Sequence, residues 1–341
     1  MTVEFPPLLR RVLAGEDLRA DEMAATIGAI MDETLSPVRA AGLLAALAAK
    51  GETVDEVVGA ARAMRERCVR VEHDLPFVLD IVGTGGDGAG TINISTAAAF
   101  VVAGCGVPVA KHGNRAASSA CGSADVLEAL GVRIDRAPEA SARALREDGI
   151  AFLFAQRHHP AMRVVGPVRR ELGVRTIFNV LGPLTNPAGA QRQMVGVARP
   201  EHVELVAAAL QALGSQAGAV VHSLDGLDEI SGAAPSTVVQ FDRDGTRRWT
   251  LDPTDYGVRA TLDELRGGDA PANARALEAI LAGEPGPRSD VVALNAALAL
   301  VVAGEALDVE DGLERARTSI RTGRARAALD ALRRERETEL V

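Results

Sequence analysis

The 341-residue chain is poor in aromatic side chains and carries no excess of positive charge. Aromatic residues make up 3% of the sequence, which leaves few rings to stack on exposed nucleic-acid bases. With 37 Lys and Arg against 46 Asp and Glu, the formal net charge is -9, so the basic surface typical of a nucleic-acid binder is missing. These shortages argue against a nucleic-acid partner, whereas a small anionic substrate needs only a local cluster of cations.

Cysteine and long apolar runs are also scarce. Cys68, Cys105 and Cys121 are far apart and have no second thiol or histidine at a metal-ligand spacing, which favours a reducing compartment. The longest apolar stretches, 97–110 and 291–303, are short for a membrane span and are interrupted by glycine, proline or asparagine. The first residues do not resemble a secretory leader. We therefore expect a cytoplasmic protein with no membrane partner.

Hydrophobic periodicity divides the chain into two parts. Residues 1–72 show apolar positions at helical spacing, with Thr53 and Glu56 placed as a capping box, and predict an α-helical domain. An insert near 159–187 is expected to join this domain. Residues 73–341 predict a larger α/β domain, because short strand-like runs alternate with helices; the runs are 77–82, 107–110, 132–135, 151–154, 193–196, 219–222 and 237–241. This alternation indicates a central, mostly parallel sheet flanked by helices.

A glycine-rich segment stands out after the first predicted strand. The letters GTGGDG at 83–88 precede TINIST at 91–96, which opens an apolar helix. Glycines allow the backbone to approach a ligand closely, and unpaired amides at a helix N-terminus attract phosphate. Asn93, Ser95 and Thr96 either add side-chain donors to such a site or serve as ordinary helix caps. The segment is a candidate phosphate cradle.

The turn after the second predicted strand is basic. GTGGDG also fits the pattern GxGxxG of a dinucleotide site, but that site needs an acidic residue at the end of the second strand. No Gly-Lys-Ser/Thr of a Walker loop follows the glycines either. The polar residues found at that place are Lys111, Asn114, Arg115, Ser118, Ser119 and Ser123. We expect them to contact phosphate at the carboxyl edge of the sheet, in preference to forming a plain solvated loop.

Two further groups of charged residues are candidates for binding. Asp228 and Glu229 follow the predicted strand at 219–222, and adjacent carboxylates at a strand end suit a hard cation such as Mg²⁺, although an exposed acidic turn has the same letters. Arg169 and Arg170 are neighbours on a predicted helix; one can bind a carboxylate, or both can lie on the surface. The nucleophile pattern G-x-S-x-G is missing.

Taken in order, these motifs resemble the anthranilate phosphoribosyltransferase family. The likeness rests on GTGGDG with NIST, KHGNR at 111–115, HPAM at 159–162 leading to Arg169, the stretch 179–187 and the acidic run 225–229, and it covers nearly the whole chain. The resemblance implies a fold like that of the nucleoside phosphorylases and phosphoribosyltransferases. It also implies Mg²⁺, a homodimer formed through the α domain, and transfer of phosphoribose from 5-phosphoribosyl 1-diphosphate (PRPP) to anthranilate in tryptophan biosynthesis.

The resemblance assigns roles to individual residues. Those expected to bind PRPP are Gly83, Gly86, Asp87, Thr91, Asn93, Ile94, Ser95, Thr96, Lys111, His112, Gly113, Asn114, Arg115, Ser118, Ser119 and Ser123. Gly83, Asn114 and Arg169 are expected to bind anthranilate, and Ser95, Asp228 and Glu229 to hold the metal. No general acid or base is expected, because an aromatic amine is already neutral near physiological pH.

Two other functions remain open at this stage. A pyrimidine nucleoside phosphorylase shares the general fold but has no need of the acidic pair Asp228 and Glu229 beside a diphosphate. A non-catalytic relative that binds nucleic acid is the second alternative, and the net charge of -9 argues against it.

Overall fold

The computed structural model describes residues 4–116 and 120–334. Ser118 and Ser119, two residues of the expected basic turn, lie outside these residues.

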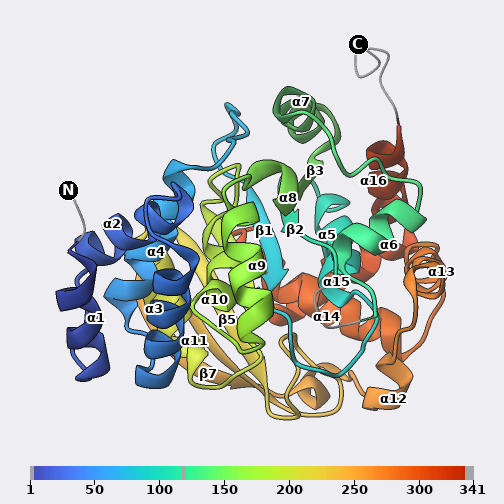
Figure 1. The fold of residues 1–341 in the computed structure, drawn as a ribbon. Helices are drawn as coiled ribbons and strands as arrows, with labels where there is room; N and C mark the ends of the chain where they lie inside the picture. The colour runs from blue at the N-terminus through green and yellow to red at the C-terminus, as the bar shows by residue number, and fades with distance from the viewer. Residues whose placement is uncertain (1–3, 117–119, 335–341) are drawn as a thin grey trace.

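Four helices form the N-terminal part of the molecule, shown in blue in Figure 1. They are α1 (Phe5–Leu13), α2 (Ala20–Met31), α3 (Pro37–Lys50) and α4 (Val54–Glu66). The expected capping box begins α4, because the Thr53 side chain accepts a hydrogen bond from the N–H of Glu56 and the Glu56 carboxylate accepts one from the N–H of Thr53.

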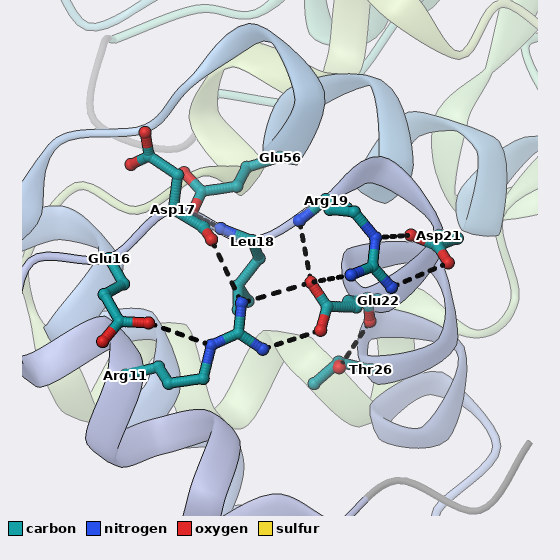
Figure 2. Close-up of polar contacts among 9 residues, drawn as sticks. All are labelled: Arg11, Glu16, Asp17, Leu18, Arg19, Asp21, Glu22, Thr26 and Glu56. Carbon is teal, nitrogen blue, oxygen red and sulfur yellow. Dashed lines mark hydrogen bonds and ion pairs between the residues drawn. The ribbon is translucent and has the colours of Figure 1, made fainter.

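Polar contacts tie the ends of these helices together (Figure 2). Arg11 on α1 donates to Glu22 on α2 at 2.7 Å. Glu56 on α4 is fully buried and accepts a hydrogen bond from the N–H of Leu18 at 3.0 Å. Lys50 lies 3.1 Å from the same carboxylate and supplies its counter-charge. The buried charge of Glu56 is therefore paired and hydrogen-bonded, as a buried carboxylate requires.

A seven-stranded sheet forms the centre of the larger part, in the order β3-β2-β1-β4-β5-β6-β7. The strands are β1 (Leu79–Gly83), β2 (Val109–Gly113), β3 (Ile150–Phe154), β4 (Arg192–Gly196), β5 (Ala217–Ser223), β6 (Ser236–Asp242) and β7 (Gly245–Leu251). The five strands β3, β2, β1, β4 and β5 are parallel, and β6 and β7 are added antiparallel. The expected α/β class with a mostly parallel sheet is confirmed.

One expected strand is absent from the described residues, and one observed strand was not expected. The run 132–135 is irregular chain between two helices; its alternating pattern arises because Val132 and Ile134 pack into the core while Arg133 and Asp135 face solvent, without a partner strand. The strand β7, rich in exposed polar residues, was not foreseen, because it pairs with β6 at the edge of the sheet and buries little of its length.

Hydrophobic clusters cover both faces of the sheet, because successive side chains of a strand point to opposite faces. A smaller third cluster includes Ala110 on β2 and Leu153 on β3. Val195, Val220 and Val239 pack with residues of the N-terminal helices and α11, whereas Met194 and Ala219 pack with α5 and α14. The remaining helices are α5 (Ile94–Ala103), α6 (Ser123–Ala129), α7 (Pro138–Asp148), α8 (Ala155–His158), α9 (Met162–Leu172), α10 (Phe178–Leu181), α11 (His202–Ala212), α12 (Leu262–Leu265), α13 (Ala270–Leu281), α14 (Pro287–Val302), α15 (Val309–Arg321) and α16 (Arg324–Arg333). Short 3₁₀ turns lie at Gly182–Leu184 and Pro253–Tyr256.

After β3 the chain leaves the sheet and returns to it at β4. Helix α9 contacts α2 and α3, and α10 contacts α4, so this segment lies against the N-terminal helices (Figure 1). Val165 and Phe178 are buried in the same core as those helices. The boundaries 1–72 and 73–341 stay predictions. No helix in the described part of the chain is both long and apolar enough to cross a membrane.

Candidate active site

The glycine-rich loop follows β1 at the carboxyl edge of the sheet. Gly85, Gly86, Gly88 and Gly90 have φ values of 66°, 79°, 75° and 64°, a left-handed conformation that other residues adopt only with strain. Gly83 has no such conformation, but a Cβ there would collide with the carboxylate of Asp228. The loop therefore needs glycine for two reasons, its turns and the close approach of an acidic side chain.

Asp228 and Glu229 come from the turn after β5 and face the loop. The Asp228 Oδ2 accepts a hydrogen bond from the N–H of Gly85 at 2.7 Å, and the Glu229 Oε1 accepts one from the N–H of Ser95 at 2.9 Å. The acidic pair thus meets both the glycine loop and the first turn of α5. This arrangement favours a binding site over the exposed acidic turn that remained possible from the sequence.

Burial raises the pKa of both carboxyl groups. Asp87 raises the pKa of Asp228 further, and the charge of Asp228 does the same to the pKa of Glu229. Two crowded carboxylates with raised pKa values favour a bound cation, because a positive charge between them removes the repulsion. Oxygen donors of this kind are the ligands that Mg²⁺ prefers, so the pair fits that metal.

Lys111 is buried within the sheet and does not extend into the exposed turn. Its side chain is buried on β2, where Nζ donates to the carbonyl of Ile81 at 2.6 Å and lies 3.5 Å from the Ser95 Oγ. Burial lowers the pKa of Lys111, whereas the carboxylates of Asp80, Glu229 and Asp228 raise it. The ammonium group is therefore a counter-charge on the floor of the site.

Asp80 is a residue that the sequence reasoning missed. It is fully buried on β1, where its carboxylate accepts hydrogen bonds from the N–H of His112 at 3.1 Å and from the amide of Asn186 at 2.7 Å. Burial raises its pKa to about 6, and the charge of Lys111 opposes that rise. An acidic residue inside an otherwise apolar strand is the signal that could have revealed it.

The polar groups at the start of α5 differ in whether they have hydrogen-bond partners within the protein. Asn93 precedes the helix but makes no capping bond; its amide instead donates to the carbonyl of Cys121 and accepts from Asn273. The Thr96 Oγ1 is buried and has no hydrogen-bond partner among the described residues. The side chain of Ile94 lies in the hydrophobic core, so only its backbone can take part in binding. Thr91 pairs with Arg266 across the loop.

The basic turn is held by acidic residues. The guanidinium of Arg115 bonds to Glu128 at 2.8 Å and to Asp125 at 3.0 Å, and both contacts raise its pKa. The exposed Asn114 accepts from Ser123, whose Oγ lies 3.3 Å from its carbonyl. Arg115 therefore has two carboxylate partners in this structure, and its contact with phosphate stays a prediction.

Two histidines form a buried pair beside this turn. The rings of His112 and His159 are 5.1 Å apart, and His112 Nδ1 lies 3.1 Å from the carbonyl of Gly182. Burial lowers the pKa of both rings, to about 4 for His159, which keeps them neutral at physiological pH. Gly113 allows close packing here, since a Cβ would lie against Ser123 and Phe152.

The two neighbouring arginines of α9 differ in environment. Arg169 is half-buried with its guanidinium 5.8 Å from the centre of the Phe178 ring, and burial lowers its pKa, as does the nearby charge of Arg175. Arg170 is exposed. Arg175, which the sequence reasoning missed, reaches the carbonyls of Gly85 and Gly86. Nothing in its local sequence distinguishes it from a surface arginine.

Comparison with known proteins agrees with this geometry. Residues 75–326 match the model "Glycosyl transferase family, a/b domain", and residues 6–68 match "Glycosyl transferase family, helical bundle domain". An anthranilate phosphoribosyltransferase of Thermomicrobium roseum is 55% identical over 332 residues, which cover 96% of this chain and 94% of the relative. One of Desulfatibacillum aliphaticivorans is 50% identical over 329 residues, covering 96% and 97%. The chain belongs to the anthranilate phosphoribosyltransferase family.

Solved structures of this family have the same fold. The enzyme of Thermus thermophilus superimposes with a TM-score of 0.90 at 46% identity, covering 96% of this chain and 99% of that one. The anthranilate phosphoribosyltransferase of Saccharomyces cerevisiae in complex with PRPP and Mg gives a TM-score of 0.87 at 28% identity, with 95% of each chain covered. The resemblance read from the motifs is thereby confirmed.

The acidic residues of the site are few. Among the described residues, no group of three or more Asp, Glu, His or Cys gathers in a way that could hold a metal ion. Mg²⁺ is usually held by one or two carboxylates, several waters and substrate phosphates, and a pair such as Asp228 and Glu229 fits that pattern.

Proposed function

We propose that this chain transfers the phosphoribosyl group of PRPP to anthranilate, giving N-(5-phosphoribosyl)anthranilate and pyrophosphate, in tryptophan biosynthesis. The observation that carries the proposal is the junction of the glycine loop, the first turn of α5 and the pair Asp228 and Glu229, joined by two hydrogen bonds at the carboxyl edge of the sheet. That edge is where open α/β sheets bind their ligands.

The residues of the site match the charge changes of the reaction. Breaking the bond between the sugar and the diphosphate places positive charge on the sugar and negative charge on the leaving group. The N–H groups of Gly86 and Asp87 in the glycine loop make no hydrogen bond with a described residue, and as fixed donors they would stabilise this negative charge without reorganising. Bound Mg²⁺, which Asp228, Glu229 and the Ser95 hydroxyl would hold, supplies further stabilisation of the diphosphate.

The acceptor side of the cleft needs a cation for the anthranilate carboxylate and no strong base for its amine. Arg169 is half-buried on α9 and has no carboxylate partner in the described part of the chain, so its guanidinium fork is available to a carboxylate. Asn114 is exposed at the end of β2 and can donate its amide. Positioning of the two substrates then accounts for the catalysis.

The proposal also covers the oligomeric state and the cellular location of the enzyme. We infer a homodimer formed through the α domain, where Leu13 and Val38 leave 68% and 82% of their surface exposed on α1 and α3. We also infer that the protein is cytoplasmic, because reducing conditions suit the thiols of Cys68, Cys105 and Cys121.

The experiment that tests the function follows the loss of anthranilate fluorescence in the presence of PRPP and Mg²⁺, with and without a chelator. We expect a loss that the chelator abolishes. The variant Asp228→Asn with Glu229→Gln should remain folded and lose turnover, because the metal anchor is gone. A double variant with wild-type kinetics at limiting Mg²⁺ would contradict the metal assignment.

The same protein is then given thymidine and phosphate as a control. A pyrimidine nucleoside phosphorylase would release thymine, and the double variant would retain that activity. Release of thymine without consumption of anthranilate would replace the proposed function by this alternative.

A further inference from the structure

Arg175 contacts the glycine loop through two backbone carbonyls. It lies two residues after Gly173, whose φ of 63° ends α9. Its Nη1 donates to the carbonyl of Gly86 at 3.3 Å and to that of Gly85 at 3.5 Å, and its Nη2 lies 3.4 Å from the carbonyl of Gly85. Because α9 packs against α2 and α3, this arginine links the N-terminal helices to the loop (Figure 1).

The loop leaves space for this contact. A Cβ at position 86 would collide with the Nη1 of Arg175, so the guanidinium occupies the place of the missing side chain. Arg175 is half-buried; burial and the charge of Arg199 lower its pKa, and Asp228 raises it. An arginine stays protonated in such surroundings, which makes it a constant donor to carbonyl oxygens.

The contact determines where two amide groups point. In a planar trans peptide, the N–H is directed away from the C=O of the preceding residue. Holding the carbonyls of Gly85 and Gly86 therefore orients the N–H groups of Gly86 and Asp87. Neither of these N–H groups makes a hydrogen bond with any residue that the structure describes, whereas the N–H of Gly85 is bonded to Asp228. The loop is thus held on both sides, and two donors are left for a ligand.

We propose that Arg175 is a positioning residue, which acts through the carbonyls of Gly85 and Gly86 to preset the N–H groups of Gly86 and Asp87 for the diphosphate of PRPP. The inference rests on the proposed function, because that function supplies the diphosphate. It gives the α9 segment a role in the donor site in addition to the acceptor role of Arg169.

The experiment compares Arg175→Met with Arg170→Met, a matched control on the exposed face of α9. Binding of PRPP with Mg²⁺ is measured by calorimetry, and both Michaelis constants are determined. Hydrogen exchange of the segment 83–93 is followed at short times in the ligand-free protein. We expect Arg175→Met to weaken PRPP binding about tenfold, the usual size for loss of a charge-assisted hydrogen bond. The anthranilate Michaelis constant should stay within about twofold.

Hydrogen exchange separates positioning from direct contact with the ligand. We expect faster exchange of the loop in Arg175→Met before any ligand is added, and partial recovery of both binding and exchange in Arg175→Lys, which keeps a cationic donor. Unchanged PRPP affinity in Arg175→Met overturns the inference. Weaker affinity with unchanged exchange also overturns it, since the arginine would then act on the ligand itself.

Failure of the proposed function has a different signature. In that case the wild-type protein binds no PRPP and consumes no anthranilate, whatever the behaviour of the loop. If the wild-type protein binds PRPP, and the Arg175 variants bind it as tightly as Arg170→Met does, the proposed function stands and the proposed role of Arg175 is wrong.

Discussion

At the scale of single residues, the geometry of the site depends on glycines as much as on charged side chains. Gly83 and Gly196 both lie against Asp228, one against its carboxylate and the other against its backbone carbonyl. A Cβ at either position would displace the acidic turn from the glycine loop. The position of Asp228, the proposed metal ligand, therefore depends on two glycines in different strands.

We predict that Gly83→Ala lowers kcat/KM by about a hundredfold, because displacement of a reacting or metal-holding group by about 1 Å costs that much. The backbone of Gly83 is not left-handed, so the melting temperature should change little. Steady-state kinetics at saturating Mg²⁺ together with thermal unfolding provide the measurement. The control is Gly166→Ala on α9, where no atom lies within 4 Å of the added Cβ. Wild-type kinetics in Gly83→Ala would disprove the packing argument.

At the scale of elements, the helix N-termini differ in whether a side chain forms a capping hydrogen bond. Thr53 closes a complete capping box on α4, whereas Ser36 stands at the same position of α3 without a side-chain capping bond. Both helices belong to the same hydrophobic core. The two caps can therefore be compared within one domain.

We predict that Thr53→Ala lowers the free energy of unfolding by about 1 kcal/mol, the usual cost of losing an N-cap hydrogen bond. Ser36→Ala should cost much less, because no hydrogen bond of its side chain caps the helix. Urea unfolding followed by circular dichroism measures both variants under the same conditions. Equal losses would mean that the capping bond of Thr53 adds nothing to stability.

At the scale of the whole molecule, hydrophobic clusters cover both faces of one sheet, and the candidate site residues come from different layers. Arg169 and Arg175 belong to the segment that packs on the N-terminal helices, whereas Asp228 and Ser95 belong to the sheet and the helix that covers it. The substrates of this enzyme are therefore expected to bind between the layers, and the outer face of α1 and α3 remains for contact with a second chain.

We predict that the proposed dimer depends on this outer face. Val38→Glu should raise the dissociation constant of the dimer at least about tenfold, because a charge placed in an apolar interface must lose its water. Light scattering coupled to size exclusion over a range of protein concentrations shows the change. The control is Leu307→Glu, at a residue 92% exposed just before α15. A monomeric wild-type protein, or equal effects in both variants, would contradict the α-domain interface.

Much of the site could be predicted because its residues are close together in the sequence. The glycine loop, the first turn of α5 and the acidic pair are short motifs. The residue types in each of them indicate which ligand, phosphate or a cation, it could bind. Lys111 was expected in the turn after the second strand, whereas it is buried within β2, because the sequence does not tell where that strand ends. Arg115 was expected to meet phosphate, and only the fold shows that Asp125 and Glu128 hold it.

The sequence by itself determined the α/β class, the helical N-terminal part and the family, because periodicity and motif order are properties of neighbouring residues. The phosphate-binding role of the glycine loop stays a prediction. The tertiary structure decided which groups act together. Asp80, Asn186 and Lys111 come from three distant segments, and Arg175 reaches a loop about ninety residues before it in the chain. Contacts of that range arise only when strands and helices have packed, so no local pattern could reveal them.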